Sequence, residues 1–203
     1  GTIDYITPQI YWSRSFAAAN YNTLLKWWSN EVKTNAKVHP VHLYFGVADY
    51  KVGADSDAAW KDKMELPNQV IANRGNGTVK GQMHFSLRHV RNNALGYRTV
   101  LKQQLYNYKA VTPATPWKNS AVTLKPTSVR AVKDTAGVKL TITDNNRVQP
   151  RKYAIYRFTG NNVGSYQDPK NILDVVYNTN GTTTFVDQTA NTSNTYTYGI
   201  VAL

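Results

Sequence analysis

The sequence predicts two parts of different fold class, an α/β part followed by an all-β part. Up to about residue 108, strand-like runs alternate with helical stripes of apolar residues. After Pro126, short strand-like runs follow one another at close spacing. Between the two parts, residues 113–126 contain Pro113 and Pro116 among small polar residues, which is typical of a linker with extended backbone.

The first part contains the signals of three strand–helix units. The clearest helix follows Asn20, which can cap a helix N-terminus, because apolar residues then recur every three to four positions. Pro67 suits the first turn of a second helix, and Gly75 suits its end. The expected strands are Ile3–Trp12, Val41–Val47 and Val79–Leu87, and the expected helices are marked by Tyr21, Leu24, Leu25, Trp28 and Val32, by Pro67–Arg74, and by Tyr97, Val100, Leu101, Leu105 and Tyr108.

Alternating strands and helices imply parallel strands joined by helical crossovers. Three such strands are few, since a closed (β/α)8 barrel takes about 250 residues, or about 31 for each unit. The first part is therefore either a small open sheet or the end of a larger barrel. Because the chain starts two residues before its first expected strand, we expect a fragment of a larger barrel.

The second part predicts a β-sandwich. Apolar and polar residues alternate from Val138 to Ile142, and Asn180-Gly181 is a turn signal typical of hairpins. The last run, Thr195–Leu203, resembles the penultimate strand of fibronectin type III domains, so a sandwich of that kind would lack its last strand. The expected strands are Ser128–Lys133, Val138–Thr143, Lys152–Phe158, Ile172–Tyr177, Thr183–Asp187 and Thr195–Leu203.

Composition excludes several classes of protein. Hydrophobic residues make up 41% of the 203 residues, with 14 Tyr and 5 Trp, as in a folded globular chain. No apolar run approaches the ~20 residues that cross a bilayer, and the absence of Cys excludes disulfides and thiolate metal sites. The net charge of +12 favours a polyanionic partner. Its Lys and Arg residues are dispersed, however, so we do not expect nucleic-acid binding.

Three stretches of the first part resemble one known family. They are Ile3–Trp12 (IDYITPQIYW), then His42–Gly46 (HLYFG) with Tyr50–Gly53 (YKVG), then Glu65–Gln69 (ELPNQ). In this order and at these separations they resemble the C-terminal part of the bacterial glycosyl hydrolase-like family ten, over about residues 1–118.

This resemblance implies a secreted or cell-surface protein with a TIM-type (β/α)8 barrel. The chain would hold about the last three βα units of the barrel, and a fibronectin type III-like module often follows the barrel in that family. The expected domains are then residues 1–112 for the partial barrel, residues 113–126 for the linker, and residues 127–203 for a fibronectin type III-like β-sandwich.

A glycoside hydrolase needs two carboxyl groups that flank the scissile bond, and in a barrel they lie at the C-terminal ends of strands. Among the seven carboxylates of residues 1–118, Asp49 alone closes an expected strand on that face. Asp62 and Glu65 precede the expected helix at Pro67 and suit its positive end. Asp49 is therefore the candidate catalytic residue, and we expect at least one further acid upstream of residue 1.

Residues that follow the three expected strands are candidate substrate contacts. Aromatic rings stack on sugar rings, and amides bond vicinal hydroxyls. Tyr11 and Trp12 alternate along one strand, so one of them alternatively packs inside. Lys51 contacts an anionic group of the substrate or is solvated, and Arg88 is a candidate clamp for a carboxylate. The candidate substrate-binding residues are Gln9, Tyr11, Trp12, Tyr50, Lys51, Ser86 and Arg88.

Two functions follow from these observations. The first is the C-terminal fragment of a secreted glycoside hydrolase-like protein that acts on cell-wall or extracellular polysaccharide, inactive on its own. The alternative is a non-catalytic carbohydrate- or cell-wall-binding surface protein. Both place the protein outside the cell or on its surface, with a polysaccharide or cell-wall glycan as partner and self-association through exposed strand edges. No cofactor is expected, and no metal site, because the four His residues lack metal-ligand spacing; His84 is expected to be a packed strand residue.

Overall fold

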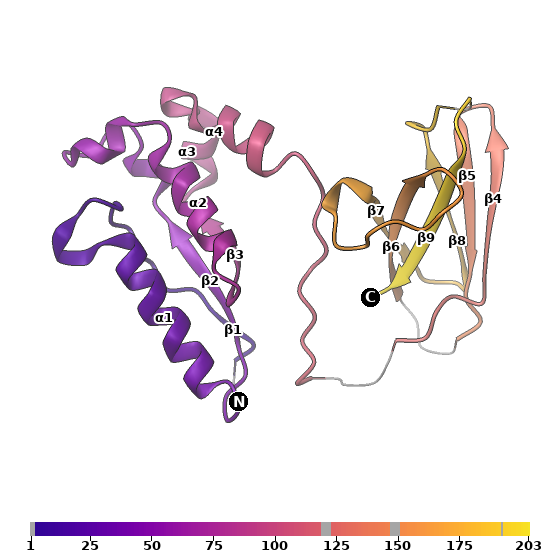
Figure 1. The fold of residues 1–203 in the computed structure, drawn as a ribbon, viewed down its shortest axis with the longest axis horizontal. Helices are drawn as coiled ribbons and strands as arrows, with labels where there is room; N and C mark the ends of the chain where they lie inside the picture. The colour runs from indigo at the N-terminus through magenta and orange to yellow at the C-terminus, as the bar shows by residue number, and fades with distance from the viewer. Residues whose placement is uncertain (1–2, 119–122, 147–150, 192) are drawn as a thin grey trace. The chain divides into compact units, whose positions relative to one another are not determined.

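The computed structural model describes residues 3–118, 123–146, 151–191 and 193–203. The chain divides into two compact units, Gly1–Asn107 (unit 1) and Tyr108–Leu203 (unit 2), each drawn in Figure 1. Residues 119–122 of the expected linker lie outside the described residues. Over the described ranges, no helix combines the length and apolar character needed to cross a membrane.

Unit 1 contains a three-stranded parallel sheet in the order β1-β2-β3. Its first strand is much shorter than the expected Ile3–Trp12. The run is interrupted at Thr7-Pro8, where Pro8 has no N–H to donate to a neighbouring strand. The chain returns to β2 at a parallel bridge between Gln9 and Gly46. The strands are β1 (Tyr5–Ile6), β2 (His42–Val47) and β3 (Val79–His84).

The first two expected helices of unit 1 are present. Asn20 caps the first, since its side chain accepts hydrogen bonds from the N–H groups of Asn22 and Thr23. The second begins two residues before Pro67, whose missing N–H falls in the first turn, where no intrahelical acceptor exists. The third expected helix is present from Tyr97 to Leu105, where an α-helical turn continues directly into a π-helical turn. A short helix not predicted from the sequence precedes it. The helices are α1 (Tyr21–Asn35), α2 (Glu65–Gly75), α3 (Leu87–Asn92) and α4 (Tyr97–Val100), with a π-helical turn at Leu101–Leu105.

Two apolar clusters hold unit 1 together. In the first, Tyr21 and Leu25 of α1 pack on Leu43 and Phe45 of β2. The second cluster joins the segment after β2 to α2, α4 and the π-helical turn, and its largest buried side chain is Trp60. The sheet and its helices therefore form one packed layer structure, as the alternation of strand and helix signals predicted.

Unit 2 contains two three-stranded antiparallel sheets, β4-β5-β8 and β7-β6-β9. Leu140 and Ile142 of β5 and Tyr153 and Ile155 of β6 are fully buried in one core that both sheets share. All six expected strands are present, each within one residue of its expected bounds. They are β4 (Ser128–Asp134), β5 (Gly137–Thr143), β6 (Arg151–Thr159), β7 (Ile172–Asn178), β8 (Thr182–Asp187) and β9 (Tyr196–Ala202).

The Asn180-Gly181 turn does not close a hairpin, contrary to the expectation from the sequence. β7 pairs with β6 and β8 pairs with β5, so this turn carries the chain from one sheet to the other. Gly181 has a φ of 81°, the left-handed region that glycine adopts without steric cost. The sequence predicted the local turn, whereas the choice of strand partner depends on packing between the sheets.

Candidate functional site

The carboxyl ends of the three parallel strands meet at one edge of the sheet in unit 1. The segments that leave the strands there are residues 9–16 after β1, residues 48–53 after β2, and residues 85–92 after β3. In parallel α/β sheets, ligands bind at this edge because it is where loops from several strands converge.

Three aromatic rings, one from each of these segments, contact one another at the edge. The Tyr11 ring stacks on Phe85, with centroids 6.2 Å apart and an interplanar angle of 25°. Tyr50 meets both rings edge-on, at centroid distances of 5.9 Å to Tyr11 and 6.3 Å to Phe85. Phe85 is 54% exposed and Tyr50 is 36% exposed, so this aromatic cluster of Tyr11, Tyr50 and Phe85 presents apolar surface to solvent.

Gly46 of β2 leaves the space that Tyr11 occupies. A Cβ atom at this position would lie 3.3 Å from both Tyr11 Cε1 and Gln9 Cγ. Burial, with Tyr50 and Asp49 nearby, raises the pKa of Tyr11 above its usual value. The Tyr11 side chain therefore keeps its proton at neutral pH and can donate a hydrogen bond.

Asp49 lies at the same edge, immediately after β2, and is only 1% exposed. Tyr97 donates its hydroxyl proton to Asp49 Oδ1 over 2.8 Å. His84 Nδ1, at the end of β3, lies 2.9 Å from Oδ1 and 3.2 Å from Oδ2. Burial, and to a smaller extent the nearby Asp49 carboxylate, raise the pKa of the Tyr97 hydroxyl, so it remains a donor. Both oxygens of the candidate catalytic carboxylate are thus engaged by its neighbours.

His84 connects Asp49 to the π-helical turn. Its Nε2 atom lies 2.9 Å from the hydroxyl of Tyr106, which also accepts a hydrogen bond from the Gln82 amide. In the tautomer that carries its proton on Nδ1, His84 donates to the Asp49 carboxylate and accepts at Nε2 from the Tyr106 hydroxyl. Burial raises the pKa of Tyr106 to about 12. The sequence expectation that His84 is a packed strand residue omitted this role as the link between the buried Asp49 carboxylate and the Tyr106 hydroxyl.

The other predicted contacts are distributed around the edge. Lys51 Nζ forms an ion pair with Asp55 Oδ2 at 3.1 Å, so the positive charge of Lys51 faces the Asp55 carboxylate. The Ser86 hydroxyl lies 3.2 Å from His89 Nδ1, and His89 contacts the Tyr50 ring at 6.1 Å. Two further candidates, Gln9 and Arg88, have exposed side chains. The structure therefore brings Tyr11 and Tyr50 together, and it pairs Lys51 within its own loop.

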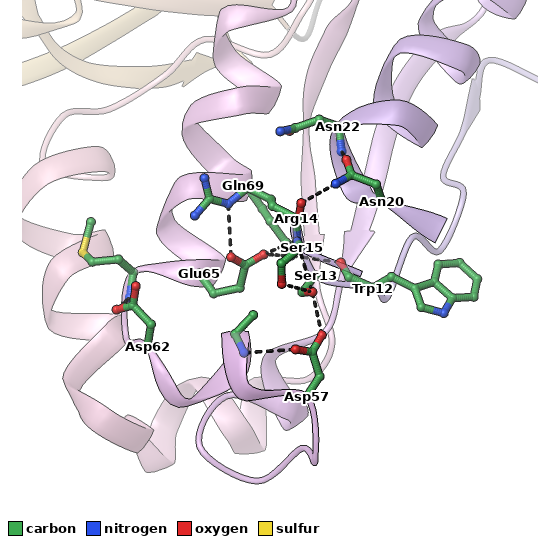
Figure 2. Close-up of polar contacts among 12 residues, drawn as sticks. Trp12, Ser13, Arg14, Ser15, Asn20, Asn22, Asp57, Asp62, Glu65 and Gln69 are labelled. Carbon is green, nitrogen blue, oxygen red and sulfur yellow. Dashed lines mark hydrogen bonds and ion pairs between the residues drawn. The ribbon is translucent and has the colours of Figure 1, made fainter. Parts of the chain in front are cut away.

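Trp12 follows Tyr11, and its side chain is 40% exposed. A network of polar side chains bonds to the main chain at and after Trp12 (Figure 2). Glu65 and Gln69 of α2 reach the backbone of residues 12–14, and Asp57 bonds to Ser13. Glu65 is therefore not simply a residue at a helix N-terminus, as expected from the sequence. It is 4% exposed and pairs with Arg14, which lies 51 positions earlier in the chain.

Among the described residues, no group of three His, Cys, Asp or Glu side chains is arranged to hold a metal ion. The polar groups at the edge are instead tied to one another in pairs and short chains of hydrogen bonds. What this arrangement offers is a partly exposed aromatic surface beside buried hydrogen-bonding groups.

Residues 1–62, which carry Tyr11, Trp12, Asp49 and Tyr50, match the family described as Glycosyl hydrolase-like 10. The chain belongs to the glycosyl hydrolase-like 10 family. This confirms the family that the three sequence stretches indicated.

Two curated relatives of this chain are called glycosyl hydrolases. Glycosyl hydrolase YngK of Bacillus subtilis (strain 168) is 40% identical over 206 aligned positions, which cover 100% of this chain and 38% of the relative. Glycosyl hydrolase DigH of Escherichia coli (strain K12) is 50% identical over 56 positions, which cover 28% of this chain and 12% of the relative. The chain thus spans well under half of the length of either relative.

Sequence reasoning missed four residues that shape the site of this glycosyl hydrolase-like 10 chain: Phe85, Tyr97, Glu65 and Arg14. Phe85 directly follows β3 in the structure, but the expected strand ran to Leu87, so the sequence placed Phe85 inside a strand. Tyr97 belonged to a helical stripe and was assigned to the core, which hid the role of its hydroxyl. The Arg14–Glu65 pair had no local signal, because the two residues meet only in the folded chain.

Proposed function

We propose that unit 1 binds a polysaccharide or cell-wall glycan at the carboxyl edge of its sheet, as part of a glycoside hydrolase-like protein. The observation that carries this proposal is the aromatic cluster of Tyr11, Tyr50 and Phe85, contributed by three loops, with the exposed Trp12 next to it in sequence. Such rings stack on the apolar faces of sugars. Family membership supports a glycan as the partner, and the proposal places the protein outside the cell or on its surface.

Glycan binding is tested by replacing Trp12 in the 203-residue chain. We expect Trp12→Ala to weaken the binding of wall oligosaccharides at least tenfold, because one stacked ring contributes about 1 kcal/mol or more beyond its buried area. Titration calorimetry gives the affinity, and quenching of Trp fluorescence reports on the indole ring.

The matched control for this test is Trp27→Ala on α1, which removes a tryptophan that is 52% exposed. It should leave the affinity unchanged. Equal affinities of wild type and Trp12→Ala would show that Trp12 is not part of the glycan site, and equal losses in both variants would show that binding is not localised at the edge.

Hydrolysis requires a second carboxyl group within about 5–10 Å of the first. Of the carboxylates described in unit 1, Asp49 directly follows a strand at this edge, and its oxygens are occupied by Tyr97 and His84. We therefore propose that at least one catalytic acid of the whole protein lies outside this chain, in a (β/α)8 barrel of which β1–β3 form a part.

The 203-residue chain is accordingly expected to hydrolyse no glycosidic bond. Screening it with aryl glycosides and purified peptidoglycan tests this expectation. Turnover at ordinary enzyme rates that disappears in Asp49→Asn would mean that the chain contains a complete active site.

The second candidate function is a carbohydrate-binding surface protein without catalysis. The burial of Asp49 favours it, since a carboxylate that is 1% exposed and bonded to Tyr97 and His84 does not face the solvent side, where a sugar would bind. The two functions agree on glycan binding and differ in the activity of the longer protein, so the hydrolysis assay repeated on that protein separates them.

Unit 2 supports the proposal of a fibronectin type III-like module. Its first, second and fifth strands form one sheet and its third, fourth and sixth form the other. Near the start of β9, the Tyr196 hydroxyl accepts a hydrogen bond from the backbone N–H of Asn191 over 3.2 Å. A tyrosine at this place, bonded to backbone a few residues upstream, is common in sandwiches of this type.

Self-association is a further part of the proposal. Among the described residues, β1 and β3 each pair with β2 on one side only. Unpaired edges of parallel strands are normally covered, so we expect the isolated chain to form dimers at micromolar concentration, as light scattering would show.

A further inference from the structure

We propose that Glu65 and Gln69 of α2 are positioning residues that orient Trp12 for glycan binding. Neither residue reaches the exposed ring of Trp12; both act on the backbone from which it projects. This inference rests on the proposed function, and it concerns how the site is organised rather than whether it binds a glycan.

Glu65 holds the residue that follows Ser13. It is 4% exposed, and its Oε1 accepts a hydrogen bond from the Arg14 N–H over 2.8 Å. Its Oε2 accepts another from Arg14 Nε over 3.1 Å. A buried carboxylate that binds both the main chain and the side chain of one residue fixes the position and the direction of the backbone there.

Gln69 lies one turn after Glu65 on the same face of α2, as residues four apart do. It is fully buried, and its Nε2 donates to the carbonyl oxygen of Trp12 over 3.2 Å and to Glu65 Oε1 over 3.0 Å. One helix therefore holds the carbonyl of Trp12 and the N–H of Arg14, the two groups on either side of Ser13.

Further side chains hold the same segment. Ser13 donates its hydroxyl proton to Asp57 Oδ2 over 2.6 Å, and the Asn20 side chain donates to the Arg14 carbonyl (Figure 2). Residues 12–14 are thus bonded by α2, by the loop after β2 and by the cap of α1. We define these contacts of Glu65, Gln69, Asp57 and Asn20 as the backbone clamp.

The clamp acts on Trp12 through its main chain. The Trp12 side chain extends away from the network in Figure 2, and it is 40% exposed. A binding platform that is already ordered loses less conformational entropy when the ligand arrives. The clamp therefore contributes to affinity through the backbone, without touching the glycan.

The test replaces Glu65 by Gln in the 203-residue chain. The amide can still accept from the Arg14 N–H, but it loses the charged partner of Arg14 Nε. We expect the dissociation constant for wall oligosaccharides to rise about tenfold. With 5-fluorotryptophan in the chain, the ¹⁹F resonance of Trp12, assigned through Trp12→Phe, should shift and broaden, while the resonances of Trp27 and Trp60 stay in place.

The matched control is Asp62→Asn, three residues earlier. Asp62 accepts from the Met64 N–H over 2.8 Å and is no part of the backbone clamp. It should change neither the affinity nor the Trp12 resonance. If Glu65→Gln does not fold, Ser13→Ala replaces it in the test. This variant removes the hydrogen bond from the Ser13 hydroxyl to Asp57, which belongs to the same backbone clamp.

The outcomes separate this inference from the proposed function. If the wild type binds no glycan, the proposed function fails, and the ¹⁹F spectrum still decides whether the clamp orders Trp12. If the wild type binds and the folded clamp variants keep both its affinity and its Trp12 resonance, the positioning role is wrong. A general loss of stability would instead move all the tryptophan resonances together.

Discussion

Asp187→Ala is expected to lower the free energy of unfolding of unit 2 by about 3 kcal/mol. Asp187 is the last residue of β8, and its side chain is 2% exposed. Arg157 Nη1 and the Tyr198 hydroxyl donate to its Oδ2 over 2.8 and 2.9 Å, and Thr189 donates to its Oδ1 over 2.7 Å. Breaking one member of a buried charged network typically costs this much, because its partners remain desolvated without an acceptor.

Hydrogen exchange of the β6 and β8 amides measures this loss within unit 2. Asp168→Ala is the matched control, since Asp168 caps the backbone N–H of Lys170 near the surface and should cost less than 1 kcal/mol. Similar losses in the two variants would mean that the Asp187 network contributes nothing beyond a surface cap.

The same carboxylate makes the stability of unit 2 depend on pH. Burial alone would raise the pKa of Asp187, but hydrogen bonds from Thr189, Tyr198 and Arg157 outweigh burial and hold the pKa below its ordinary value. A depressed pKa stabilises the folded state at pH values above the pKa of the unfolded state, about 3.9. This stabilisation is lost as the pH falls toward the pKa of the folded state. The stability difference between wild type and Asp187→Asn should therefore be constant from pH 7 to about pH 5 and shrink below about pH 4. A difference that stays constant down to pH 2 would contradict it.

The sequence predicted the elements that depend on local signals. Strands of unit 2 were found to within a residue because each is a short run of strand-forming residues between turn residues, and buried positions alternate most clearly in β5. Helix α1 was found because Asn20 and the stripe that follows it lie within a few turns. The sequence failed at the Asn180-Gly181 turn, because distant strands decide the partners and the turn joins two sheets rather than two paired strands. It also overestimated the length of β1, which ends before Pro8.

The candidate site shows the same division. Tyr11 and Tyr50 could be paired in advance, because residues that follow parallel strands share one edge. The interpretation of Glu65 was reasonable on local grounds, since a carboxylate at a helix N-terminus is favourable there. Its actual partner is 51 residues away, and no pattern in a single sequence reveals that contact. The roles of Tyr97 and His84 toward Asp49 were hidden for the same reason.

Asp49→Ala is expected to cost unit 1 about 3 kcal/mol of stability. The carboxylate accepts from the Tyr97 hydroxyl and from His84, and Tyr97 is fully buried, so alanine leaves that hydroxyl without an acceptor. Tyr97→Phe should cost only about 1 kcal/mol, because it removes one donor and leaves Asp49 bonded to His84. Urea unfolding followed by the fluorescence of Trp60, which lies in the same apolar cluster as Tyr97, measures both.

Asp55→Ala is the control for this experiment, since Asp55 forms a partly exposed pair with Lys51 further along the same loop. If Asp49→Ala costs no more than Asp55→Ala, the buried network does not hold the loop after β2. If it costs the expected amount, a loss of activity in the longer protein on changing Asp49 is not by itself proof of catalysis. The discriminating variant is then Asp49→Asn, measured at low temperature, where the chain stays folded. If this variant binds glycan with the wild-type affinity, Asp49 shapes the loop that carries Tyr50 and does not contact the sugar.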